Sequence, residues 1–299
     1  MIYEIVPPRR DASRFSTELR GVEEVLDEGR IAAINIPELI KRRVDRGGVV
    51  YSPATIPPEE YAMLIRDRKE PIVNLIAPRL ETDALLSRVR KVLLDYKIPN
   101  LVLVGRERRE DRLPGPDVID ALRMVSSEKG NSTLGGICIF SRESTGKDEK
   151  GKVRSISEAQ RVWLKAGAGC DFVTSQICFE SGPVLSFLAS YQDLCERTGA
   201  DPITVFVSLA TVPTRSILAL LDSLDVDVPQ GVRKRLLESH DMGAESVKIA
   251  SEVFLQVVTS AEQNGIRVPL GLQIEQVGVN SGDLSLRLLD SAYPVIHPG

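Results

Sequence analysis

Eight short apolar segments, each followed by a stretch with helical periodicity, constrain the fold of this chain more than any other feature. Most of them are rich in Val, Ile and Leu and bounded by Gly, Pro or Asn, as buried parallel strands are. The segments lie at 1–6, 31–36, 71–77, 100–105, 133–140, 171–178, 203–209 and 268–274. Eight strand–helix units in 299 residues predict an α/β fold, a (β/α)8 TIM barrel in which residues 1–299 form a single domain.

The helical stretches follow the strands in order, with an excess of helix before the last strand. They lie at 13–26, 58–66, 82–96, 116–126, 157–165, 183–197, 214–224, 229–238, 243–264 and 281–292. A doubly wound open sheet is the alternative fold, because alternation alone does not distinguish a closed sheet from an open one. No Gly-x-Gly-x-x-Gly follows the first strand, which weighs against a dinucleotide-binding sheet.

Two polar segments fall between these elements. Residues 141–154 after the fifth strand are interpreted as a lid or a disordered surface loop, and disorder is favoured because no residue there forces order. Residues 41–58 after the second strand are also interpreted as a loop, to which 49–51 could add a short strand.

Composition excludes several classes of function. A net charge of −4, with the arginines of 106–109 interleaved with acids, predicts no nucleic-acid partner. No run of about 18 apolar residues and no basic leader are present, so we expect no membrane partner and a cytoplasmic location. Four cysteines without a C-x-x-C pair and only two histidines make a metal site or a Ser-His-Asp triad improbable.

Glu4 is a carboxylate in the middle of the first apolar strand. It shares a face with Ile2 and Val6, because side chains alternate along a strand. If that face lines a barrel, burial would raise the pKa of Glu4 and suit it to general acid catalysis. The alternative is that Glu4 pairs with an Arg or Lys and only fixes the register of the strand.

Function in a barrel concentrates where strands end, and these ends carry a polar ring without a histidine or cysteine nucleophile. The members of this ring are Glu4, Asn35, Glu38, Asn74, Glu107, Gln176, Phe179, Glu180, Thr211, Arg215, Gln273 and Glu275. Such a ring suits hydrogen bonding to a heterocycle and proton donation better than hydrolysis. For each member, the alternative is a strand-end side chain with a purely structural role.

Two segments resemble the methylenetetrahydrofolate reductase family. Tyr3-Glu4-Ile5-Val6-Pro7-Pro8 is similar to its F-E-x-x-P-P opening, and 168–180 is similar to its A-G-A-D-F-x-x-T-Q-x-x-F-D segment. The chain departs from the second pattern at Cys170, Ser175 and Glu180. The resemblance covers most of the chain, and the fold of the family is a (β/α)8 barrel.

The resemblance implies that the chain reduces the methylene group of 5,10-methylenetetrahydrofolate, or of a related pterin, to 5-methyl. Glu4 matches the general acid of the family, and Gln176 matches the glutamine that hydrogen-bonds the pterin. Glu107 lies near the position of a family aspartate, in Val104-Gly105-Arg106-Glu107. Glu38, Phe179 and Gln273 are the other expected substrate-binding residues.

NADH or NADPH is the expected hydride donor. FAD is possible, although Ile139-Phe140-Ser141-Arg142 stands where the family carries Tyr-Pro and His-Pro contacts to it. The expected cofactor-binding residues are Asn35, Asn74, Arg106, Lys165 and Arg215, and among them Lys165 matches a lysine of the family. The interpretation slightly favours a flavin-independent reductase.

A non-catalytic pterin-binding or scaffold subunit of a one-carbon pathway complex is the alternative function. A reduced folate or related pterin is the expected partner in either case. A homo-oligomer is possible.

Overall fold

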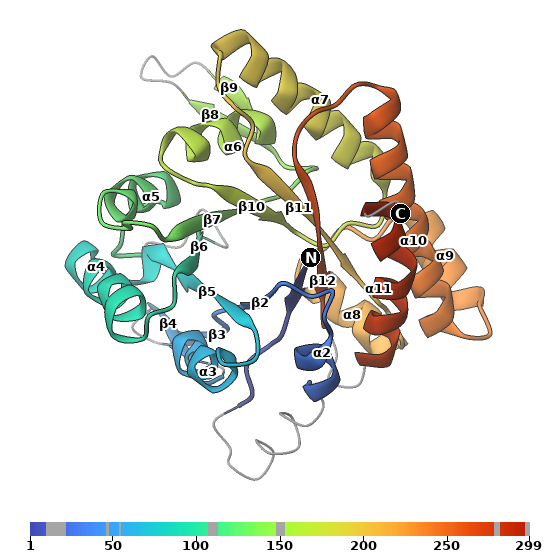
Figure 1. Ribbon diagram of the computed structural model, residues 1–299, viewed down its shortest axis with the longest axis horizontal. Coiled ribbons are helices and arrows are strands. Elements are labelled where there is room, and N and C mark those ends of the chain that lie inside the picture. The colour runs from blue at the N-terminus through green and yellow to red at the C-terminus, as the bar shows by residue number, and fades with distance from the viewer. Residues whose placement is uncertain are drawn as a thin grey trace.

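Eight parallel strands close into a barrel in the computed structural model (Figure 1). In order around the barrel they are β1 (Ile2–Glu4), β12 (Leu270–Glu275), β11 (Thr204–Ala210), β10 (Phe172–Ser175), β7 (Thr133–Cys138), β6 (Asn100–Val104), β5 (Glu70–Ile76) and β2 (Ala33–Ile36). All eight predicted strands are present, and the closed order confirms the (β/α)8 barrel over the open sheet. The structure describes residues 1–9, 22–45, 48–53, 55–106, 113–147, 153–277 and 282–296.

Helices surround the strands, as Figure 1 shows. They are α2 (Glu23–Asp27), α3 (Pro58–Ile65), α4 (Thr82–Arg90), α5 (Val118–Ser126), α6 (Glu158–Gly167), α7 (Ser181–Thr198), α8 (Arg215–Ser223), α9 (Gln230–Glu238), α10 (Met242–Gln263) and α11 (Gly282–Ile296), with the single turns η1 (Ala77–Arg79) and η2 (Lys91–Asp95). The extra helices before the last strand are α9 and α10, as predicted. No helix in this described part of the chain has the length and apolar character needed to cross a bilayer.

Local sequence explains where several helices begin. Ser157 and Gln160 form a capping box at the start of α6, and Asp117 accepts hydrogen bonds from two backbone N–H groups of α5. Asp241 caps α10 in the same way. Such a cap stabilises a helix by about 1 kcal/mol, so these residues fix the ends that the periodicity leaves uncertain.

Two antiparallel hairpins extend the C-terminal side of the barrel. The strands β3 (Ile40–Asp45) and β4 (Gly48–Pro53) follow β2, and β8 (Glu143–Lys147) and β9 (Val153–Ser157) follow β7. The expectation of disorder over 141–154 is therefore wrong for the described residues of that segment, because backbone pairing between the two arms orders them. The loop expected over 41–58 is also wrong over most of its length, because β3 and β4 pair there, although β4 does contain the short strand expected at 49–51.

Two apolar layers hold the barrel together. The larger lies between the strands and the helices, and the smaller fills the lower lumen around Ile2, Ile72, Val102 and Phe172. A Cβ atom added at Gly135 would lie 2.5 Å from the Phe172 ring. The absence of a side chain at position 135 therefore makes room for an aromatic ring whose burial is worth about 1.5–3 kcal/mol.

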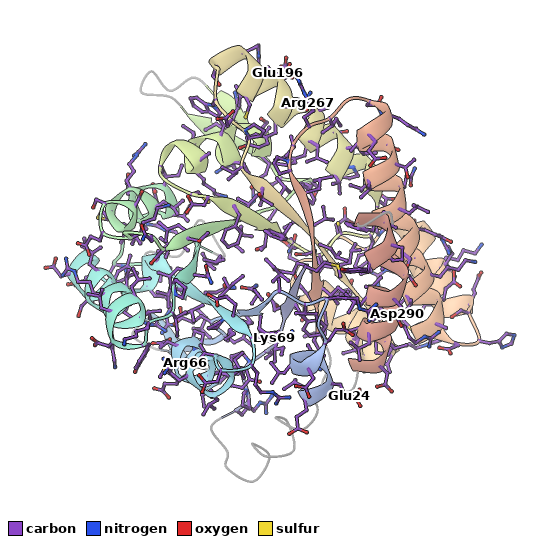
Figure 2. All side chains as sticks on the ribbon, viewed as in Figure 1. Glu24, Arg66, Lys69, Glu196, Arg267 and Asp290 are labelled. Atoms are coloured by element: carbon purple, nitrogen blue, oxygen red, sulfur yellow. The ribbon has the colours of Figure 1, made fainter. Side chains whose placement is uncertain are left out.

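Charged side chains lie mainly on the outer surface of the helices (Figure 2). One example is the ion pair between Arg267 and Glu196, whose atoms are 3.0 Å apart. Exposed pairs of this kind contribute at most about 1 kcal/mol each. Carboxylates in the barrel interior are the exception and mark the candidate site.

Candidate functional site

The upper half of the barrel lumen is polar, in contrast to its apolar floor. Alternation along the strands places one set of polar side chains above the floor, and all of them are at least 95% buried. These are Asn35, Asn74, Thr174, Ser208 and Gln273. One level higher, at the C-terminal mouth, Glu4, Gln176 and Glu275 keep some exposed surface, while the carboxyl groups of Glu4 and Glu275 are enclosed. The C-terminal mouth is the face on which barrel enzymes carry their active sites.

Glu4 and Glu275 are neighbours at this mouth. They are paired in the parallel register of β1 and β12, and both side chains lie on the lumen face of their strands. The Nε2 atom of Gln273 lies between them, 3.2 Å from Oε1 of Glu275 and 3.5 Å from Oε2 of Glu4. The Nδ2 atom of Asn35 donates a 2.8 Å hydrogen bond to the same Oε2 of Glu4. Two amides therefore hold the two carboxyl groups in place.

Burial favours the protonated form of both carboxyl groups. It raises the pKa of Glu4 well above its ordinary value, the negative charge of Glu275 raises it further, and the hydrogen bond from Asn35 lowers it. Burial raises the pKa of Glu275 to about 7, against the lowering effect of the neighbouring Ser208 hydroxyl and Gln273 amide. Burial and the neighbouring carboxylate thus both favour the protonated form of Glu4.

Several buried atoms next to this pair have no hydrogen-bond partner among the described residues. They are Oδ1 of Asn35, Oδ1 of Asn74, Oγ1 of Thr174 and Oε1 of Gln273. An unpaired buried polar atom costs roughly 1–3 kcal/mol, and native proteins have few. Three of these four atoms are amide oxygens, which accept hydrogen bonds, so N–H groups of a bound molecule would satisfy them.

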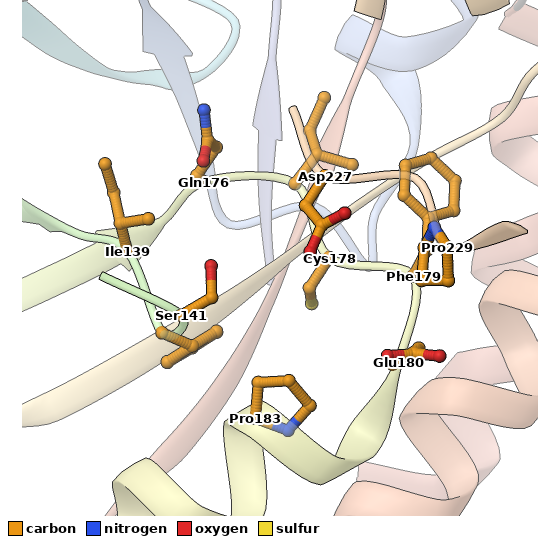
Figure 3. A pocket seen from close by; sticks show the side chains of 11 residues that line it. Ile139, Ser141, Gln176, Cys178, Phe179, Glu180, Pro183, Asp227 and Pro229 are labelled. Carbon is orange, nitrogen blue, oxygen red and sulfur yellow. The ribbon is translucent and has the colours of Figure 1, made fainter. Parts of the chain in front are cut away.

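A pocket adjoins the mouth on the side of β7 and β10 (Figure 3). It has a volume of about 410 Å³, partly open to solvent, and Gln176, Phe179, Glu180 and Asp227 contribute to its wall. Gln176 is on the lumen face of its strand, so it connects the pocket to the mouth. Only about 40 Å³ of this space has room for the centre of a water-sized molecule, so the pocket is a shallow depression beside the mouth rather than a cavity of small-molecule size.

The segment 168–180 that resembles the reductase family is mostly structural. Gly169 has φ +93°, and an added Cβ there would lie 2.0 Å from the Ser126 hydroxyl. Asp171 accepts a 2.8 Å hydrogen bond from the backbone of Leu134, and Ser175 accepts one of the same length from the backbone of Ser208. Gln176 is the side chain of this segment that reaches the mouth from the strand end.

Glu38 lies apart from the lumen group. Its carboxylate accepts hydrogen bonds from Arg88 (2.7 Å), Arg79 (3.0 Å) and the backbone of Ile76 (2.7 Å), and Arg88 also binds Glu59 at 2.8 Å. The carboxylate of Glu38 is thus occupied by protein groups. It ties the end of β5 to α4, so these contacts give Glu38 a structural role rather than the expected pterin contact.

The expected cofactor residues do not gather at one place. Asn35 and Asn74 belong to the lumen, and Arg106 and Arg215 are exposed after β6 and at the start of α8, with β7 and β10 between their strands. Lys165 is buried behind the wall, donates to the carbonyl of Ile137 and lies 3.9 Å from Glu158. Burial lowers the pKa of Lys165.

Two further residues complete the comparison with the sequence predictions. Glu107 lies outside the described residues. Glu275 belonged to the polar ring of strand ends but was not selected as a site residue. The spacing of Gln273 and Glu275 could have found it, because residues two apart on the last strand share the lumen face with the first-strand carboxylate.

The fold and this lumen define a class, a (β/α)8-barrel protein with a buried pair of carboxyl groups at its C-terminal mouth. No protein-family model matches the chain, and no curated protein matches it. Among solved structures it is similar to an uncharacterized protein from Clostridium thermocellum that binds two copies of 5-methyl-5,6,7,8-tetrahydrofolic acid, with a TM-score of 0.76, 17% identity and coverage of 99% of this chain and 94% of that one.

The chain is also similar to two spore cortex-lytic enzymes named SleL. The one from Bacillus cereus has a TM-score of 0.51, 13% identity and coverage of 96% of this chain and 73% of that one. The one from Bacillus megaterium QM B1551 has a TM-score of 0.50, 11% identity and coverage of 97% and 73%. At these identities the likeness establishes the barrel fold.

Proposed function

We propose that the chain binds a reduced folate or related pterin at the C-terminal mouth of the barrel. The observation that carries this proposal is the buried pair Glu4 and Glu275, surrounded by amide and hydroxyl groups with unmet hydrogen bonds. An aminopyrimidinone edge carries the N–H donors that such acceptors require. The similar protein from Clostridium thermocellum, which binds a methylated reduced folate, gives independent support.

We further propose that the reaction is the reduction expected from the reductase resemblance, with Glu4 as general acid. The proton of Glu4 passes to N10 of the methylene-bridged substrate while the bond between the methylene carbon and N10 breaks and its electron pair stays on N10. The lone pair of N5 then forms an iminium cation. Hydride from NADH or NADPH adds to the iminium carbon to give the methyl group, and solvent reprotonates Glu4. A raised pKa suits Glu4 to this step at neutral pH.

The side-chain nitrogens of Lys165 and Asn35, two of the expected cofactor residues, are not available to FAD. Lys165 is enclosed between the barrel wall and α6, where the Ile137 carbonyl and Glu158 occupy its ammonium group. The side-chain nitrogen of Asn35 is committed to Glu4. No step is therefore assigned to a flavin, and direct hydride transfer from the nicotinamide is the proposed route.

The experiment is a paired measurement of binding and turnover. Purified protein is titrated with 5-methyltetrahydrofolate by calorimetry, and oxidation of NADH and NADPH is followed after addition of 5,10-methylenetetrahydrofolate. We expect Glu4→Gln to lower turnover by roughly 100-fold or more while pterin binding persists, because an amide cannot donate an acidic proton. Glu24→Gln removes an exposed carboxylate from α2 and should leave both readouts unchanged. Turnover that survives in Glu4→Gln would refute the acid role.

A non-catalytic pterin-binding subunit is the second candidate, because a similar protein binds the 5-methyl form that the reductase reaction would produce. The same experiment separates the two candidates. Pterin binding without nicotinamide oxidation in the unmodified protein would support the binding subunit. The absence of both binding and turnover would refute both candidates.

A further inference from the structure

The carboxyl pair at the mouth has no balancing cation among the residues that the structure describes. Neither Glu4 nor Glu275 makes an ion pair with an Arg or Lys within the described residues. Other buried carboxylates of this chain are compensated, as Glu38 is by two arginines and Glu158 by Lys165. Two charged carboxylates side by side in a buried site repel strongly, so the pair is expected to keep a proton.

Amide groups lie close to both members of the pair. Gln273 lies 3.2 Å from Glu275 and 3.5 Å from Glu4, and Asn35 donates a 2.8 Å hydrogen bond to Glu4, so an amide N–H group lies against each carboxyl group. Both amide contacts of Glu4 are made to Oε2. Its Oε1 receives no hydrogen bond within the described part of the chain, so this oxygen is free to carry the proton and donate it.

We propose that Glu4 and Glu275 hold a single proton between them at neutral pH, and that Glu275 is a positioning residue that keeps this proton on Glu4. Its remaining negative charge would attract a ligand that becomes cationic when it accepts the proton. The attraction of a cationic ligand by Glu275 rests on the proposed function, in which protonation by Glu4 gives an iminium cation. Proton sharing itself depends only on the geometry of the pair.

Few other titratable groups face the pair. Asn35 from β2, Ser208 from β11 and Gln176 after β10 carry no charge. The thiol of Cys178 is close enough to Glu275 for the carboxylate to raise its pKa, together with burial, to about 12, so this thiol is neutral. The two carboxyl groups therefore account for the titration of the mouth near neutral pH, as far as the described residues determine it.

The test is a carboxyl-carbon NMR titration of glutamate-labelled protein, with Glu4→Gln and Glu275→Gln used for assignment. In a coupled pair, each resonance responds to both protonation steps. We expect the Glu4 and Glu275 resonances of the unmodified protein to show both steps. We expect Glu275→Gln to lower the titration midpoint of Glu4 by about one pH unit or more, a tenfold change in proton affinity. Glu24→Gln is the matched control for the loss of one carboxylate and should leave both midpoints unchanged.

Independent single-step titrations in the unmodified protein would overturn the proposal, and this measurement needs no variant to fold. A Glu4 midpoint that does not move in a folded Glu275→Gln variant would overturn it as well. Glu275→Asp, which keeps a carboxyl group, should retain the coupling. Coupled titration without pterin binding or turnover would refute the proposed function but support proton sharing by Glu4 and Glu275. Turnover with uncoupled titration would refute only the proposal of proton sharing.

Discussion

Glu275→Gln is expected to make the protein more stable, with a gain that appears only as the pH rises. Burial raises the pKa of Glu275 from its ordinary value of 4.5 to about 7. The folded state therefore binds this proton more tightly than the unfolded state. Stability from this group is fully present below about pH 4.5 and is lost as the pH rises through about 7, because deprotonation charges a buried group. Glutamine keeps the shape of the side chain and removes this loss.

The size of the effect follows from the shift. A change from 4.5 to about 7 corresponds to about 3 kcal/mol, at about 1.36 kcal/mol for each pKa unit. The variant should therefore exceed the unmodified protein in free energy of unfolding by roughly 2–3 kcal/mol at about pH 8 and by close to zero at about pH 4.5. Release of Glu4 from the neighbouring charge adds to the gain in the same direction.

Urea denaturation at the two pH values measures this difference directly. Glu24→Gln, which removes an exposed carboxylate on α2, should change stability by less than about 0.5 kcal/mol at either pH. If Glu275 served mainly as a hydrogen-bond acceptor for Gln273 and Ser208, its removal would destabilise the protein at both pH values. A loss of stability at about pH 8, or a difference that does not depend on pH, would refute the reasoning.

Two further predictions concern the scaffold. Arg88→Met removes a cation shared by two largely buried carboxylates, Glu38 and Glu59, and should lower the free energy of unfolding by about 3–5 kcal/mol in urea denaturation. Arg90→Met breaks an exposed ion pair on the same helix and should lower it by less than about 1 kcal/mol. Equal losses for the two variants would contradict this prediction. Gly135→Ala should destabilise the barrel by about 1–3 kcal/mol, because the added Cβ would lie 2.5 Å from the Phe172 ring. Gly29→Ala is the control, since a Cβ added at Gly29 would have no atom within 4 Å and should change stability little. Unchanged stability of Gly135→Ala would show that the ring can move.

The fold could be predicted from the sequence because its strands are buried on both faces. Such strands appear as continuous runs of Val, Ile and Leu, and all eight were located from these runs. The hairpin between β8 and β9 was missed because its arms carry a charged and Gly-containing sequence. Backbone pairing between neighbouring arms orders such a segment without an apolar pattern.

The site could be predicted only in part. Alternation along the first strand placed Glu4 in the lumen, and the strand ends indicated Asn35, Gln176 and Gln273. Glu38 was misleading, because the arginine that occupies it lies 50 residues further along the chain and comes near it only in the fold. Glu275 was not selected because it lies far from Glu4 in the sequence. The two residues become neighbours only when β12 pairs with β1 and closes the barrel.

The contrast among the buried carboxylates carries the functional argument. Glu38 and Glu158 lie next to arginine or lysine at the outer wall, where a charge pair holds a strand end against a helix. Glu4 and Glu275 lie at the mouth with amides as their neighbours, and no described Arg or Lys forms an ion pair with either of them. Mutation and selection remove an uncompensated buried charge unless it serves a purpose, because it lowers stability. A pair that costs stability above neutral pH, at the face where barrels bind ligands, is therefore the feature on which the proposed proton transfer to a bound molecule rests.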